Sequence, residues 1–246
     1  MKLSYFVVEI RRMFRSPRFV LFAIGLPVVM FLLQANVFIK TSEADHAALV
    51  AVVMVNMMTY GTFAAAMTSG TRLAVERAAG WTRQLRLTPL SGGGYLGAKA
   101  LSGMLVGLPA LIVVPLIGAL FEGVHLDASG WVRIILGIWL GTVPLVLLGL
   151  LLGQFGTPDS MQPITMLVML AMAFLGGMWI PIEGMPGWMH DLSQIMPTYW
   201  IIQLVRPAVT NTMLVGFPAA LGVLAAWTVV LGALVIRRYR KDSARV

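Results

Sequence analysis

Long uncharged stretches alternate with short polar ones along this chain, and the pattern predicts helices that cross a membrane. The apolar runs show no period-2 alternation, so helices rather than strands are expected. Each run is long enough to cross a hydrocarbon core of about 30 Å as a helix. The sequence therefore predicts one all-α integral membrane domain over residues 1–246, with six transmembrane helices. These spans are expected at about residues 19–38, 48–71, 100–121, 133–153, 161–182 and 214–236.

The first 17 residues predict an amphipathic helix that lies in the cytoplasmic headgroup layer. Apolar residues from Leu3 to Phe14 recur at helical spacing, and the charged residues fall elsewhere on the helical wheel. Pro17 ends this helix before the first span. The alternative is a secretory signal peptide, but the apolar run that follows is long for one, and no cleavage site follows it.

The segment between the last two spans predicts short re-entrant helices at the outer face. Within residues 183–212, two apolar pieces at 188–195 and 200–205 are each broken by proline and are too short to span. Trp188, Tyr199 and Trp200 are typical of anchors at the membrane interface.

Small residues in the third and fourth spans predict close helix packing. Packing within the chain is favoured over a dedicated dimer interface. The residues are Gly103, Gly107, Gly137, Gly141, Gly149 and Gly153.

Composition supports a membrane protein and narrows its chemistry. The chain is 59% hydrophobic and 11% charged, with a mean hydropathy of +0.86. It has no cysteine, which excludes a disulfide framework and thiolate metal sites. The net charge of +8 raises the alternative of nucleic-acid binding, which is disfavoured because the basic residues are divided among three short segments.

The basic residues predict the orientation of the chain. If there are six spans, 15 of the 18 lysines and arginines fall on one side of the membrane. The positive-inside rule then places both termini and the 72–99 loop in the cytoplasm. The other side receives Lys40, Arg133 and Arg206.

The chain lacks the residues that would supply energy or catalysis. The apolar cores of the spans contain no ionisable side chain, whereas ion-coupled transporters and intramembrane enzymes usually need one. Its three histidines have no metal-ligand spacing, and no phosphate-binding loop motif is present. We therefore expect no metal or nucleotide on this chain, no enzyme activity, and an energy source that docks from the cytoplasm.

One charged segment interrupts the apolar pattern, the sequence ERAAGWTRQLRLTPLS at residues 76–91. Ala78, Trp81 and Leu85 fall on one helical face, and Pro89 ends the pattern. A short amphipathic helix between two spans can present its polar face to a soluble partner. The alternative is a basic loop that only sets topology.

Two sets of motifs at the expected places among the spans carry a family resemblance. The first is Glu76-Arg77, Gly80, Gln84-Leu85, Thr88-Pro89-Leu90-Ser91 and Lys99. The second is Gly176-Gly177, Pro181, Pro186 with Trp188, Pro197 with Tyr199, and Arg206. On these residues the chain resembles the permease subunits of ABC-2 type exporters, particularly the drug- and antibiotic-exporting branch. It departs from the pattern at residues 154–160, a loop without a basic residue.

The resemblance implies a transport subunit that is driven by a separate ATPase. Two ATP-binding subunits, which hold ATP and magnesium, would act on two permease copies, and a homodimer is favoured over a heterodimer. Residues 76–88 would form the coupling helix in a cleft of the ATPase. The implied contact residues are Glu76, Arg77, Gly80, Trp81, Gln84, Leu85, Thr88 and Pro89.

The resemblance also implies a bacterial plasma-membrane location, a cargo path and an outer gate. The cargo would be hydrophobic or amphipathic; the alternatives are a lipid-linked glycan, or a sensor or immunity component that transports nothing. The gate at 183–212 would include Pro186, Trp188, Pro197, Tyr199 and Arg206. The path candidates, for which core packing is an equal alternative, are Asn56, Met57, Tyr60, Phe63, Met166, Met169 and Phe174.

Overall fold

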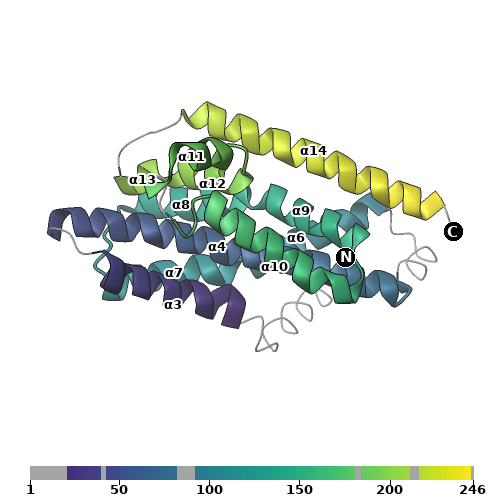
Figure 1. Ribbon diagram of the computed structural model, residues 1–246, viewed down its shortest axis with the longest axis horizontal. Helices are drawn as coiled ribbons and strands as arrows, with labels where there is room; N and C mark the ends of the chain where they lie inside the picture. Colours follow the sequence, from purple (N-terminus) through teal and green to yellow (C-terminus); the bar gives the residue numbers. More distant parts are fainter. Residues whose placement is uncertain (1–20, 40–42, 82–91, 181–183, 211–215, 245–246) are drawn as a thin grey trace.

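The computed structural model describes residues 21–39, 43–81, 92–180, 184–210 and 216–244. These residues contain helices and no strands, which confirms the all-α fold class. The long helices run roughly along the long axis of the molecule (Figure 1). The amphipathic helix predicted over the first 17 residues lies outside the described ranges.

The helices follow the apolar runs of the sequence closely. A continuous helical run begins the described chain and contains η1 (Leu21–Gly25), α3 (Leu26–Leu33) and η2 (Gln34–Phe38). The next helices are α4 (Glu43–Ala78), α6 (Gly92–Val106), α7 (Leu108–Phe121), α8 (Ala128–Gly141) and α9 (Val143–Phe155). The last are α10 (Pro158–Leu175), α11 (Gly187–Ser193), α12 (Pro197–Val205), α13 (Pro207–Thr210) and α14 (Phe217–Ala244).

Two of the predicted spans are each built from a pair of consecutive helices. α6 and α7 together form one candidate span, and α8 and α9 form another. In each pair a proline, Pro109 or Pro144, lies in the first turn of the second helix. Proline has no backbone N–H to donate, so the helical hydrogen bonding is interrupted while the chain continues in the same direction.

The structure supports five candidate spans among the described residues, by length and composition. These are α4, the α6–α7 pair, the α8–α9 pair, α10 and α14. The helix over the first predicted span is apolar but shorter, with Ala23–Val37 as its apolar part. The count of six therefore stays a prediction.

The short helices α11, α12 and α13 occupy the segment predicted to be re-entrant. They lie at the end of the bundle opposite to the last turn of α14 (Figure 1). Most of α12 is buried, including Thr198, Tyr199 and Ile202, because it packs against α14, α8 and α4. Re-entry into the membrane stays a prediction.

α4 is the central helix of the bundle, and glycines bring α9 close to it. A Cβ built at Gly70 of α4 would lie 2.0 Å from the carbonyl oxygen of Gly149, and one at Gly153 would lie 2.3 Å from that of Gly70. Gly137 and Gly141 in α8 make room for the side chains of Val205 and Ile201 of α12, which a Cβ would meet at 2.4 and 3.0 Å. The predicted packing of small residues within the chain is thus confirmed.

Candidate functional site

The residues that the sequence marks for coupling lie at the last turn of α4. Glu76 and Arg77 belong to α4 itself, which continues to Ala78. A turn follows, in which Gly80 has a φ of 73°, a conformation that favours glycine. Trp81 is helical again and 41% exposed.

The predicted boundary of the coupling helix at residue 76 therefore differs from the structure. No residue before Gly80 breaks a helix, so α4 runs on past the charged pair and ends in a turn at residues 79–80. The remaining predicted contact residues lie outside the described ranges. They are Gln84, Leu85, Thr88 and Pro89.

Glu76 contacts two residues of α6 instead of projecting freely from the bundle. Its carboxylate pairs with the ammonium group of Lys99, and the hydroxyl of Tyr95 donates a hydrogen bond to it at 2.6 Å. The side chain of Lys99 is only 8% exposed and that of Glu76 is 24% exposed. A charge this deeply buried requires a partner of opposite sign, and Glu76 supplies it.

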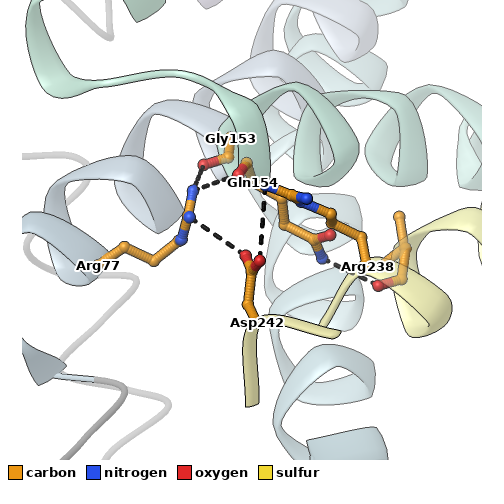
Figure 2. A network of polar contacts seen from close by, with 6 residues as sticks. Arg77, Gly153, Gln154, Arg238 and Asp242 are labelled. Carbon is orange, nitrogen blue, oxygen red and sulfur yellow. Dashed lines mark hydrogen bonds and ion pairs between the residues drawn. The ribbon is translucent and has the colours of Figure 1, made fainter. Parts of the chain in front are cut away.

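Arg77 points to the end of α9 and to the last turns of α14 (Figure 2). Its guanidinium donates hydrogen bonds to the carbonyl oxygens of Gly153, at 3.1 Å, and Gln154. These carbonyls belong to the last turn of α9, where the helix itself offers no N–H partner. The same guanidinium pairs with the carboxylate of Asp242 at 3.2 Å.

Asp242 and its neighbours fasten α14 to α9 as well. The second carboxylate oxygen of Asp242 lies 3.5 Å from Arg238, whose guanidinium stacks over the ring of Phe155 at 4.7 Å. The amide of Gln154 donates to the carbonyl oxygen of Val235 at 3.1 Å. We call the contacts among Arg77, the Gly153 and Gln154 carbonyls, Arg238 and Asp242, together with the Gln154–Val235 hydrogen bond, the three-helix clasp.

Sequence reasoning assigned no contact to Tyr95, Gln154, Arg238 or Asp242. Asp242 is the single acidic residue in the basic run RRYRKDSARV, and Gln154 is a polar residue at the end of an apolar span. Each is a local exception that could have marked a contact. Neither Asp242 nor Gln154 shows, from the sequence alone, which distant residue it contacts.

The predicted path residues are divided between the core and the surface. Asn56, Met57, Tyr60 and Phe63 of α4 are all buried within the chain. Met166 and Phe174 of α10 are exposed, and Met169 is partly buried against the core. The two groups do not form one continuous exposed surface, so their role in a path stays a prediction.

Aromatic rings connect the core to the surface of α10. Tyr60 lies 5.5 Å from Trp179 between ring centroids, and Phe174 lies 5.1 Å from the same tryptophan. The buried indole N–H of Trp179 finds no hydrogen-bond partner among the described residues, and an unpaired buried donor costs free energy. This aromatic row therefore combines an apolar surface with one unused donor.

The predicted gate residues lie in the short helices. Pro186 precedes α11, and Trp188 is 67% exposed, whereas Pro197 and Tyr199 are buried in α12. Arg206 follows α12 and is buried. No group of three or more potential metal ligands occurs among the described residues.

Comparisons with known proteins bear on the function of this site. The model of the family described as ABC-2 type transporter matches residues 4–209. The chain is also similar to a Bacillus subtilis (strain 168) protein named "Putative transport permease YvfS", with 30% identity over 194 residues. The aligned part covers 78% of this chain and 79% of that relative.

Proposed function

Since the chain belongs to the ABC-2 type transporter family, we propose that it is the membrane-spanning permease subunit of an exporter for hydrophobic or amphipathic compounds. Family membership indicates a multi-pass transport permease rather than an enzyme, and such permeases normally work with an ATP-binding subunit. In this proposal two ATP-binding subunits hold ATP and magnesium and act on two permease copies. The complex lies in a bacterial plasma membrane with both termini cytoplasmic.

The observation that carries this proposal is the way the end of α4 is held. Glu76 and Arg77 tie the last turn of α4 to α6, α9 and α14 immediately before the turn at residues 79–80. A partner that moves the segment after this turn therefore moves the central helix of the bundle. Such an arrangement suits a subunit that receives work from outside its own chain.

Among the described residues, Trp81 is the best candidate for direct contact with the ATP-binding subunit. Its side chain is 41% exposed just beyond the end of α4, and large aromatic side chains commonly anchor protein interfaces. Glu76 and Arg77 have partners within the chain, so we assign them to holding α4 in place. The further contacts in 82–91 follow from the resemblance of the sequence to the family.

α10 is the best candidate for contact with a second permease copy. It is the least buried of the five candidate spans and also the least apolar. A span that faces lipid alone is expected to be strongly apolar, so low burial with low hydropathy favours a protein neighbour. Cargo would then pass between the two copies, beside the exposed residues Met166 and Phe174.

A lipid-linked glycan is the second candidate cargo, and the aromatic row favours it. Phe174, Trp179 and Tyr60 form a series of rings, and the indole N–H of Trp179 has no partner within the described part of the chain. Flat aromatic faces beside a hydrogen-bond donor suit the mixed polar and apolar surface of a sugar. Met166, which is exposed on α10, favours the smaller apolar cargo, because methionine adapts to many shapes.

The first experiment tests whether Trp81 contacts an ATPase. The detergent-solubilised chain is used to capture ATP-binding proteins from its own host, and bound ATP hydrolysis is measured for wild type and Trp81→Ala. We expect wild type to retain an ATP-binding-cassette protein and Trp81→Ala to lose most of it. Trp188→Ala is the matched control, because it removes an exposed tryptophan from α11 at the opposite end of the bundle.

Each result has a clear meaning. Loss of the ATPase with Trp81→Ala but not with Trp188→Ala supports coupling through this segment. Capture of no ATPase by wild type would contradict the exporter and leave a sensor or immunity component. Efflux from vesicles of a hydrophobic dye, compared with a lipid-linked oligosaccharide, then separates the two cargo classes.

A further inference from the structure

We propose that Asp242 is a positioning residue for energy coupling: through Arg77 it fixes the direction in which the chain leaves the end of α4. This inference rests on the proposed function for its role in transport. Its structural part concerns the end of α4 alone and can be tested without a partner. Asp242 lies in α14, beyond the residues 4–209 that the family model matches.

The three-helix clasp connects each of its helices to the other two. Arg77 links α4 to α9 through two backbone carbonyls and links α4 to α14 through Asp242. Gln154 links α9 to α14 through the carbonyl oxygen of Val235. The position of the Arg77 guanidinium is thus set from two sides (Figure 2).

Of the three Arg77 contacts described above, the one with Asp242 is the one that joins opposite charges. A planar guanidinium binds a carboxylate by charge as well as by hydrogen bonds, whereas the carbonyl oxygens are neutral acceptors. Asp242 is itself held by Arg238, which rests on the ring of Phe155. The carboxylate of Asp242 thus has a second cationic partner besides Arg77, and its side chain is 29% exposed.

The orientation of Arg77 matters because α4 ends one residue later. Ala78 is the last helical residue, and the N–H of Gly80 bonds to the carbonyl oxygen of Arg77 at 3.1 Å. The turn that leads to Trp81 is thus built directly on the backbone of Arg77. If the side chain of Arg77 is released, the last turn of α4 can fray and Trp81 loses its fixed position.

The structural test measures how Trp81 is positioned in the chain alone. The chain contains no cysteine, so Trp81→Cys and Asp159→Cys can carry two spin labels without background. In lipid nanodiscs without any partner, Asp242→Asn is expected to broaden the distance distribution between the labels. Asp242→Glu keeps the charge and is expected to preserve the narrow distribution. Asp191→Asn, the same change in exposed α11, is the matched control and is expected to have no effect.

The functional test uses the unlabelled chain with the ATP-binding protein that co-purifies with it. We expect Asp242→Asn to lower ATP-driven transport roughly fivefold relative to ATP hydrolysis, the size expected from one partly exposed charged contact. Asp242→Glu and Asp191→Asn should behave as wild type does.

The two tests separate the inference from the proposed function. If the labels respond but wild type retains no ATPase, positioning by Asp242 holds and the proposed function fails. If wild type transports and Asp242→Asn matches it in both tests, the inference is wrong. It is also wrong if Asp242→Asn lowers only the thermal stability, because Asp242 would then serve only to fasten α14.

Discussion

At the residue scale, Lys99 shows how this bundle keeps a charge inside. The ammonium group lies against the carboxylate of Glu76, and the ring of Tyr95 lies 5.9 Å from it. Removal of water strengthens the attraction between the two charges but makes each charge costly without the other. Each charge of the pair therefore mainly offsets the cost of burying the other, and the pair adds little net stability.

Glu76→Gln tests this interpretation. We expect it to destabilise the chain by about 2–3 kcal/mol, because Lys99 stays mostly buried while it loses the Glu76 carboxylate. Glu76→Gln/Lys99→Met should lose less than Glu76→Gln alone, since no buried ammonium remains. Thermal unfolding in detergent of wild type, both single variants and the double variant measures this coupling; additive losses would contradict it.

Asp127 gives a prediction on pH. It lies before α8 outside the spans, and hydrogen bonds from the Ser129 hydroxyl and the Gly130 N–H hold the pKa of its carboxyl below the usual 3.8. Because the folded pKa is the lower one, its stabilisation is complete above about 3.8 and is lost as the pH falls through the folded pKa.

The measurement for Asp127 is the thermal midpoint between pH 6 and pH 2.5. Asp127→Asn keeps a capping side chain that does not ionise, so its midpoint should fall less steeply at the acidic end than that of wild type. Parallel curves for the two proteins would show that Asp127 contributes nothing to the pH dependence.

At the element scale, α4 and α9 can cross closely because the residues at their contact are glycines, which have no side chain. Backbone meets backbone where Gly70 faces Gly149 and Gly153. Any Cβ at Gly70 would overlap the carbonyl group of Gly149, so the two helices would have to separate. Close contact of this kind gains dispersion energy along both helices, which is the main force between helices surrounded by lipid.

Gly70→Ala is expected to destabilise the chain by about 1–3 kcal/mol through this overlap. Gly222→Ala is the matched control, because a Cβ there meets nothing within 4 Å in exposed α14. Alanine favours helices over glycine, so the control should be neutral or slightly stabilising. Equal effects of the two substitutions in thermal unfolding would show that the crossing does not limit stability.

The elements themselves could largely be predicted from the sequence, whereas their contacts could not. Apolar runs located the helices because burial in lipid selects for length and composition. The apolar runs did not show which face of α4 turns to the core, because α4 is apolar on all sides. Asn56 and Tyr60 could therefore not be assigned to core or path. The contact of Arg77 with Asp242 joins residues 165 positions apart, and no local sequence pattern predicts a contact over that separation.

At the scale of the whole molecule, the two ends of the bundle differ in chemistry. Ion pairs fasten α4 to α6 and α14 at one end, where hydrogen bonds hold α9 as well, and α11–α13 lie at the other end. Between the ends, α10 contributes the least apolar and least buried candidate span. A single copy thus leaves one side of the bundle suited to a protein neighbour.

Cross-linking tests whether a second copy lies there. Met166→Cys of α10 is expected to form a disulfide-linked dimer in membranes under mild oxidation. Val229→Cys of α14 is equally exposed, at 70% for both residues, and is expected to stay monomeric. Dimer formation only through residue 229 would place the neighbour at α14, and no dimer at either position would favour pairing with a different permease.

The close contact at Gly70 also divides α4 into two unequal arms. From Gly70 the helix extends about 12 Å to Ala78 and about 40 Å to Glu43, at 1.5 Å per residue. If α4 tilts as a stiff rod about its contact with α9, a displacement at the Ala78 end is magnified about threefold at the Glu43 end. The contact with α9 would then be the fulcrum of a lever, which converts a small push near Trp81 into a wide swing at the far end.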